Sequence, residues 1–218
     1  MRETIAKLFG GTCFVCRGAA RAVLCEACDA ELPRLAQPLC PRCALESPGG
    51  AVCGRCLADP PHYDATLAAL AYEFPADVLI HALKFRGELA LAPFLGSLLK
   101  SDETVDCIVP VPLSRERLRE RGYNQAVELA RATGLPIELD LCTKTRSTAP
   151  QINLPLEERR RNVRGAFQCE RSLIGRTVAV VDDVMTTGAT LDELASTLKA
   201  AGASRVVNWV VARTFPPG

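Results

Sequence analysis

Beyond residue 60, short apolar runs alternate with stretches of helical periodicity. Strands are predicted at 65–72, 107–111, 137–141, 177–181 and 206–211, and helices at 78–85, 89–99, 124–132 and 191–201. The run at 178–181 is apolar at every position, which is typical of a strand that helices cover on both faces. The alternation therefore predicts an α/β fold with a mostly parallel, doubly wound sheet.

The first 60 residues show a different pattern. They contain several Pro and Gly residues, no long apolar period, and eight of the 11 cysteines of the chain. Bound metal, rather than a hydrophobic core, is expected to hold such a segment together. Asp59-Pro60-Pro61 indicates a short stiff linker. We therefore expect a small metal-binding module at 1–60 and the α/β domain at 61–218.

Composition and charge exclude several classes of protein. The 26 basic and 25 acidic side chains nearly cancel, so the whole chain has no bulk attraction to nucleic acid or to anionic membranes. The first eight residues lack the features of a signal peptide, and no uncharged apolar run of about 18 residues occurs. We expect a cytoplasmic protein without membrane insertion. Reducing conditions there favour metal-bound cysteines over disulfides.

The eight clustered cysteines form four Cys-x-x-Cys pairs, whose spacing lets two thiolates bind one tetrahedral ion. The predicted ligands of two zinc ions are Cys13, Cys16, Cys25, Cys28, Cys40, Cys43, Cys53 and Cys56. Consecutive pairing is favoured because each connection is short enough for a hairpin, while alternate or nested grouping stays open. A redox motif is usually a single pair, and a site closed by four thiolates is structural. Cys107, Cys142 and Cys169 are expected to be buried apolar residues.

The segment 177–190 has the order strand, acidic pair, hydroxyl-rich turn and helix. We expect Asp182 and Asp183 to lie beyond the end of the strand, where ligands bind in open α/β sheets. The phosphate loop, residues 186–190, would hold an anion at the start of the next helix. Its members are Thr186, Thr187, Gly188, Ala189 and Thr190. Carboxylates suit sugar hydroxyls or Mg²⁺, so a sugar phosphate is the predicted ligand. A capping box at 190–193 explains the helix but not the two acids.

This segment resembles the motif of type I phosphoribosyltransferases that binds 5-phosphoribosyl-1-pyrophosphate (PRPP). The resemblance implies that Asp182 and Asp183 contact the ribose hydroxyls, that the phosphate loop holds the 5-phosphate, and that Mg²⁺ accompanies PRPP. The cysteine module and the segments at 81–87, 109–125 and 146–167 narrow the resemblance to the ComF (ComFC) family, the double zinc ribbon phosphoribosyltransferases. That family implies a link to DNA uptake or DNA utilisation, with single-stranded DNA and other competence proteins as partners.

The same resemblance suggests further site residues. Pro112, Leu113, Ser114 and Arg115 correspond to the loop that faces the pyrophosphate, although alternating Arg and Glu after them are also typical of a solvated helix. Other candidates are Lys84, Arg121, Asn124 and Gln125. Lys84 also ends a predicted helix, where a cation is favourable without any ligand.

The connection at 143–167 is long for a compact domain and occupies the position of the family's flexible catalytic loop. Arg146 and Gln151 are the candidate catalytic residues within it. Arg159, Arg160, Arg161 and Arg164 form a basic cluster, which either binds nucleic acid or is a solvated face. The leading hypothesis is a phosphoribosyltransferase of unknown acceptor. The alternative is a PRPP sensor that binds DNA or a partner protein, and a glutamine amidotransferase is disfavoured because no lone nucleophilic cysteine is present near the N-terminus.

Overall fold

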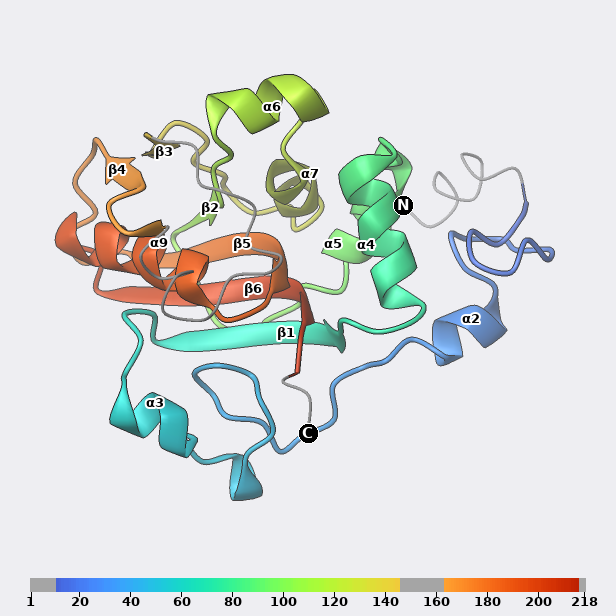
Figure 1. Ribbon diagram of the computed structural model, residues 1–218, viewed down its shortest axis with the longest axis horizontal. Helices are drawn as coiled ribbons and strands as arrows, with labels where there is room; N and C mark the ends of the chain where they lie inside the picture. Colours follow the sequence, from blue (N-terminus) through green and yellow to red (C-terminus); the bar gives the residue numbers. More distant parts are fainter. Residues whose placement is uncertain (1–10, 146–162, 216–218) are drawn as a thin grey trace.

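The computed structural model describes residues 11–145 and 163–215, and its centre is a four-stranded parallel sheet (Figure 1). The strands are β1 (Ala65–Ala71), β2 (Cys107–Pro110), β5 (Thr177–Met185) and β6 (Arg205–Arg213), in the order β1-β6-β5-β2. A short antiparallel pair, β3 (Cys142–Lys144) and β4 (Phe167–Cys169), lies outside this sheet. The parallel pairing confirms the predicted fold class.

Helices cover both faces of the sheet, as the apolar run at 178–181 predicts. On one face, Ala179 and Val181 pack with α4 (Ala76–Phe85), η2 (Leu89–Leu91), α5 (Ala92–Gly96) and α7 (Gln125–Arg131). On the other face, Val178 and Val180 pack with α9 (Ala189–Ala200), which crosses in front of β5 and β6 in Figure 1. The sheet is therefore doubly wound, with a separate hydrophobic cluster on each side.

The N-terminal segment forms two small cysteine modules. The first cysteine module, residues 11–32, ends in α2 (Glu26–Ala30) and lies on the α4 side of the molecule (Figure 1). The second cysteine module, residues 38–58, contains η1 (Pro48–Gly50) and α3 (Gly54–Ala58) and lies below β1 in that view. The two modules therefore lie apart from each other, one on the α4 side and one below β1.

The chain between the two modules covers the open edge of β1. Arg34 forms an antiparallel bridge with Leu70, and the Ala71 amide donates to the Pro33 carbonyl at 2.7 Å. The start of the second module continues along this edge, because the Thr66 amide donates to the Pro41 carbonyl at 3.0 Å. Because an exposed strand edge is a site of aggregation, this segment protects the sheet as well as spacing the modules.

Each cysteine module extends one of the two hydrophobic clusters. Phe14, Val23 and Leu24 of the first module belong to the cluster of α4 and α5. Cys40 and Cys56 of the second module belong to the cluster of α9. The modules therefore share cores with the α/β domain, and the division at residue 60 stays a prediction about the chain's organisation.

The structure corrects several predicted elements. The strand predicted at 137–141 is wrong: only Ile137 forms an isolated bridge, with Ile108. Ile137 packs against the core and Leu141 is 1% exposed, whereas Leu139 is 52% exposed. The alternating apolar pattern of this run therefore reflects the burial of two side chains and not a paired strand. The helix predicted at 89–99 is a 3₁₀ turn followed by the shorter α5. The helix α6 (Arg115–Arg121) was not among the predicted elements.

Within the described residues, no helix has both the length and the apolar character needed to cross a membrane.

Candidate functional site

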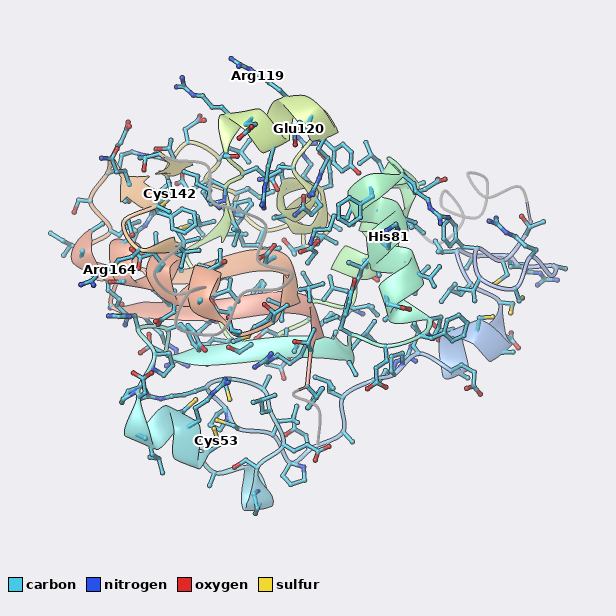
Figure 2. The ribbon with its side chains drawn as sticks, viewed as in Figure 1. Cys53, His81, Arg119, Glu120, Cys142 and Arg164 are labelled. Carbon is cyan, nitrogen blue, oxygen red and sulfur yellow. The ribbon has the colours of Figure 1, made fainter. Side chains whose placement is uncertain are left out.

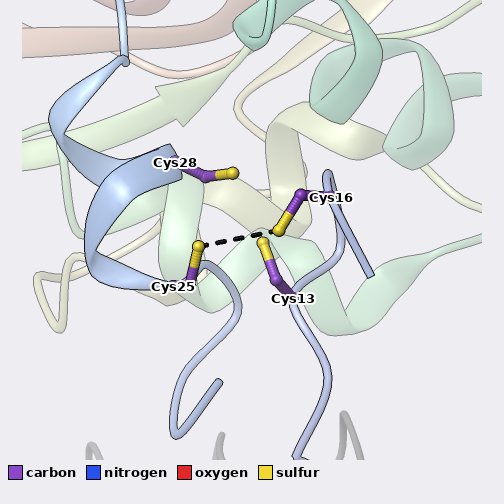
Figure 3. Close-up of side chains that lie close together, drawn as sticks. All are labelled: Cys13, Cys16, Cys25 and Cys28. Atoms are coloured by element: carbon purple, nitrogen blue, oxygen red, sulfur yellow. Dashed lines mark hydrogen bonds between the residues drawn. The ribbon is translucent and has the colours of Figure 1, made fainter. Parts of the chain in front are cut away.

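The eight paired cysteines form two four-thiol clusters. The sulfur atoms of Cys13, Cys16, Cys25 and Cys28 all lie within 4.8 Å of one another (Figure 3). The same holds for Cys40, Cys43, Cys53 and Cys56. The structure therefore confirms consecutive pairing over alternate or nested grouping. Four convergent thiols match the tetrahedral sulfur set of a structural zinc site, with no position left for water.

Each cluster combines a tight turn with the start of a short helix. Cys25 is the N-cap of α2 and Cys53 is the N-cap of α3. The Cys53 amide also donates to the Cys40 sulfur at 3.3 Å. Burial raises the pKa of Cys40, but backbone donors from Cys53 and Cys43 outweigh it and lower the pKa to about 7. The backbone therefore favours the thiolate form of Cys40, which is the form needed for metal binding.

The three remaining cysteines lie outside both clusters. Cys142 and Cys169 face each other across the β3–β4 ladder, and Cys107 is buried at the start of β2. Burial raises the pKa of Cys107 and of Cys142, which keeps both thiols protonated and inert. Cys107 and Cys142 are buried as predicted, and Cys169 is half-buried.

The acidic pair lies within β5 rather than beyond it. The strand continues to Met185, and Asp182 is paired in register with Val210 of β6. Since β2 ends at Pro110, opposite Val181, the two acids lie past the end of one neighbouring strand but not the other. The expectation that they follow the strand is thus wrong, because β6 continues to pair with β5 beyond the apolar run.

The two acidic residues have different environments. Asp183 is 2% exposed, and its Oδ2 lies 2.8 Å from the Nζ of Lys84 on α4. Burial opposes the charge on Lys84, but the carboxylates of Asp183 and Asp182 outweigh it and raise the pKa of Lys84. Asp182 is partly exposed; burial and the Asp183 charge raise the pKa of Asp182 to about 7. One carboxylate is therefore fixed in an ion pair and the other titrates near neutrality.

The phosphate loop is a glycine-dependent turn into α9. Gly188 is the N-cap of this helix with φ +87°, a left-handed conformation that favours glycine. A Cβ at this position would lie 2.8 Å from Met185 Cε and 3.1 Å from the hydroxyl oxygen of Tyr63. The backbone N–H groups at the start of α9 follow directly, where the helix dipole attracts an anion.

The two acids, the phosphate loop and several cationic side chains line one cavity of about 1040 Å³. The predicted site residues that line it are Lys84, Pro112, Leu113, Arg121, Gln125, Asp182, Asp183, Thr186, Gly188, Ala189 and Thr190. They come from α4, the segment after β2, α6, α7, β5 and the start of α9. The chain thus brings together residues that are up to about a hundred positions apart in the sequence.

Four predicted site residues lie outside the lining of this cavity. Ser114 is buried, and its hydroxyl accepts from the Arg117 amide as the cap of α6. Arg115 is exposed, and Thr187 contributes to a small neighbouring cavity. The Asn124 side chain donates to the Val111 carbonyl at 3.0 Å and caps α7. Ser114 and Asn124 therefore hold the loop after β2 in place.

Several cavity residues were missed by the sequence analysis. Arg117 lines the cavity one helical turn from Arg121, whereas Arg119 points outward from α6 (Figure 2). The i, i+4 spacing of Arg117 and Arg121 could have indicated a shared face. Lys144, at the end of β3, also lines the cavity; burial and the Arg117 charge lower the pKa of Lys144 to about 8.

Aromatic side chains form the remaining rim of the cavity. Tyr72, His81 and Phe85 line it, and the His81 and Phe85 ring centroids are 4.8 Å apart. The Arg121 guanidinium lies over the Phe85 ring at 5.2 Å and bonds to Gln125 at 2.5 Å. These contacts orient Arg121 toward the cavity.

The candidate catalytic residues Arg146 and Gln151, and the basic run Arg159, Arg160 and Arg161, lie outside the described residues. Arg164 is described and exposed, next to a Gly165 amide that donates to Glu193 on α9.

Comparison with known proteins identifies relatives that match nearly the whole chain. The chain is 34% identical to the DNA utilization protein YhgH of Escherichia coli K12, over 94% of this chain and 98% of the relative. It is 31% identical to Competence protein F of Haemophilus influenzae over the same shares. The chain belongs to the ComF family. A further ComF relative, Competence protein ComFC of Bacillus subtilis, is 27% identical over 85% of this chain and 81% of the relative.

The N-terminal part of this ComF protein also matches a family model. Residues 4–57 match the double zinc ribbon domain, which agrees with the two four-thiol clusters. The eight cysteines therefore fit two structural zinc ions, with one zinc ribbon in each cysteine module.

Solved structures resemble the ComF chain only distantly. An allosteric regulatory enzyme of purine biosynthesis is 27% identical with a TM-score of 0.37, covering 55% of this chain and 25% of that chain. A purine phosphoribosyltransferase from Pyrococcus horikoshii is 21% identical with a TM-score of 0.31, covering 68% of this chain and 78% of that chain. The fold class therefore follows from the parallel pairing of the chain's own strands.

Proposed function

We propose that this ComF protein binds PRPP with Mg²⁺ in the cavity and transfers its phosphoribosyl group to an acceptor, with release of pyrophosphate. One observation carries the proposal: a single cavity contains an acidic pair, a glycine-capped helix N-terminus and a group of cations. PRPP has complementary parts, namely a sugar with two hydroxyls and a phosphate group at each end.

The 5-phosphate binds at the phosphate loop. Thr186 and Thr190 supply hydroxyls there, and Gly188 lets the backbone approach the ligand. The helix α9 has 12 residues, so its N-terminal N–H groups and dipole offer substantial stabilisation to an anion. Because backbone N–H groups and hydroxyls bind the phosphate, the site needs no lysine. The sequence accordingly contains no Gly-x-x-x-x-Gly-Lys motif, in which a lysine binds phosphate.

The acidic pair binds the ribose and Mg²⁺. Asp183, fixed by Lys84, accepts from a ribose hydroxyl, while the partly exposed Asp182 is available to a second hydroxyl or to the metal. Carboxylate oxygens suit Mg²⁺, which prefers oxygen ligands and is usually shared with substrate phosphates. When bound, Mg²⁺ supplies charge neutralisation for the leaving group.

The pyrophosphate binds on the opposite side of the ligand, at the cations of the cavity. Arg117, Arg121 and Lys144 line it together with the backbone after β2, at Pro112 and Leu113. A departing pyrophosphate and a cationic sugar carbon mainly need neutralisation and positioning, so no protein nucleophile is required. Arg146 and Gln151 follow Lys144 in the sequence and are the proposed catalytic residues of the loop.

The test is a two-step measurement on the intact protein. PRPP with Mg²⁺ should raise the melting temperature, because a ligand that binds only the native state stabilises it by mass action. Asp183→Asn should remove most of this shift. Pyrophosphate release should then appear with one member of a panel of ammonia, nucleobases and single-stranded DNA, and Arg146→Ala and Gln151→Ala should lower that turnover with PRPP affinity nearly intact. An unchanged melting temperature at millimolar PRPP would contradict the proposal.

A second candidate function is a non-catalytic PRPP sensor that binds single-stranded DNA or another DNA-uptake protein in the cytoplasm. The names of the relatives favour it, since one is called a DNA utilization protein and another a competence protein. A sensor would bind PRPP but release no pyrophosphate with any acceptor. Its DNA binding should decline steeply with salt and be lost when Arg159, Arg160 and Arg161 are replaced.

A further inference from the structure

Arg213, the last residue of β6, is a charged side chain in the interior of the protein. It is 1% exposed. Its Nε donates to the Cys43 carbonyl at 2.9 Å, and its Nη1 donates to the carbonyls of Met185 at 2.9 Å, Thr214 at 2.8 Å and Thr186. Burying a guanidinium is costly unless it is both hydrogen-bonded and compensated by negative charge. The carbonyls satisfy only the first requirement.

The second zinc ribbon supplies the negative charge. Four thiolates around one divalent ion carry a net charge of about −2 by simple addition of formal charges. The metal centre formed by Cys40, Cys43, Cys53 and Cys56 is therefore the counter-charge of Arg213, as well as the source of one of its hydrogen-bond acceptors.

The same guanidinium also holds the phosphate loop. Met185 ends β5 and Thr186 begins the loop, so Arg213 fixes the backbone at the point where the loop leaves the sheet. One side chain thus bonds to a cysteine turn of the second module and to the start of the loop.

Two further contacts join the second module to the loop. Tyr63 is 3% exposed, packs with Cys43 and Cys56, and places its hydroxyl against Gly188. The His62 amide, just after the module, donates to Asp192 in the first turn of α9 at 2.6 Å. By contrast, the first cysteine module packs with α4 and α5 on the other face of the sheet. Figure 2 shows Cys53 in the second module, below β1.

We propose that Arg213 is a positioning residue that couples the second zinc centre to the phosphate loop. Zinc at the second centre then sets the loop's affinity for PRPP, and zinc at the first centre does not. Loss of the second ion frees the Cys43 turn and removes the counter-charge of Arg213, so the carbonyls of Met185 and Thr186 lose their fixed donor. This inference rests on the proposed PRPP site.

Coupling between two bound ligands is reciprocal, which gives a test on the unmodified protein. If zinc at the second centre favours PRPP, then PRPP with Mg²⁺ must retain that zinc by the same factor. Cys25 and Cys53 are a matched pair of reporters, because each caps a short helix and each is half-buried. Their alkylation in the presence of a zinc chelator, followed by mass spectrometry, measures zinc loss at each centre separately.

PRPP binding to wild-type protein is measured first, by calorimetry in the same buffer. We expect PRPP with Mg²⁺ to slow alkylation of Cys53 by about tenfold, for a coupling near the middle of the usual range, and to leave Cys25 unchanged. Equal protection of both cysteines, or of neither, in a sample that binds PRPP would overturn the coupling and leave the proposed function intact. A sample that binds no PRPP would overturn both.

Variants at the two ends of β6 complete the test. Arg213→Lys keeps the charge but lacks the branched set of donors, so it should raise the KM for PRPP by about tenfold with kcat little changed, and speed zinc loss at Cys53 only. Arg205→Lys is the control, because Arg205 is exposed at the start of the same strand and pairs with Glu103. Wild-type PRPP affinity in a folded Arg213→Lys protein would contradict the proposal.

Discussion

Asp182 and Asp183 are identical residues at adjacent positions, and their neighbours give them different chemistry. Asp183 is buried against Lys84, whereas Asp182 is partly exposed at the cavity, where burial and the Asp183 charge raise its pKa to about 7. An acid whose pKa is raised in the folded state binds its proton more tightly there than in the unfolded state, so its protonation stabilises the folded protein. Stability is therefore lost as the pH rises from the unfolded pKa toward the folded one.

The sign of this effect gives a prediction for the protein without PRPP or Mg²⁺. Between about pH 6 and about pH 7.5 the folded state binds more protons than the unfolded state, so this group's contribution to the unfolding free energy should fall by about 1 kcal/mol. Urea denaturation at several pH values measures it. Asp182→Asn should flatten the pH dependence by that amount. An equally steep dependence in the variant would show that another group titrates.

Gly188 supports a second prediction at the residue scale. Gly188→Ala should destabilise the protein by about 1–2 kcal/mol and abolish most PRPP binding, because the methyl group meets Met185 and Tyr63 and the backbone is left-handed. Gly134→Ala is the matched control: Gly134 has φ +73° but open space around its Cβ position. It should cost only the backbone strain of about 1 kcal/mol and keep PRPP binding. Equal losses of binding in both variants would exclude a local effect at the loop.

At the scale of elements, α6 directs its arginines in two directions. It has no buried residues, yet Arg117 and Arg121 line the cavity while Arg119 points outward (Figure 2). The Ser114 cap and the left-handed Gly122 fix its two ends, and Asn124 ties the following helix to the Val111 carbonyl. A helix with alternating charges thus becomes part of a binding site through its position.

This arrangement predicts different effects for arginines of one short helix. Arg117→Ala should weaken PRPP binding by about tenfold or more, since a charge-assisted hydrogen bond to a phosphate is lost. Arg119→Ala should have little effect. Calorimetric titration with PRPP and Mg²⁺ measures both, and pyrophosphate alone can be used as a second probe of the same cations. Equal affinities of the two variants for PRPP would contradict the placement of the pyrophosphate next to Arg117.

At the scale of the whole molecule, the two zinc ribbons support two different faces of the sheet. The first module packs with the cluster of α4 and α5, and the second with the cluster of α9. The segment between them pairs with the edge of β1. The modules are therefore part of the structure that holds the cavity, and they are not only an appendage joined by a linker.

Metal content tests this organisation. The purified protein should contain two zinc ions per chain, because eight thiolates complete two tetrahedra. Elemental analysis of protein prepared without chelator measures the number. Cys25→Ser should lose one ion and destabilise the α4 cluster, because Phe14 and Leu24 then lose their anchored backbone. One ion or none in the wild-type protein would contradict the two-site assignment.

Patterns of residues that are close in sequence determined the fold class, the zinc ligands and the phosphate loop of this protein. The parallel sheet follows from continuously apolar runs such as 178–181, and the zinc ligands follow from Cys-x-x-Cys pairs with short connections. The phosphate loop follows from an acidic pair, hydroxyls and a glycine before a helix. These features depend on residues close in sequence, so spacing alone exposes them.

Only the tertiary structure decided which distant residues meet. Lys84 reaches Asp183 because α4 packs on β5, and Arg117 and Lys144 line the cavity because α6 and β3 lie beside the same strand ends. The predicted strand at 137–141 was wrong because, within this run, only Ile137 pairs with β2. Arg213 carried no signal in the sequence, since a single arginine ending an apolar strand looks exposed. Its bonds to Cys43 and Thr186 exist because folding brings the second zinc ribbon against the phosphate loop, across 170 and 27 positions of the chain.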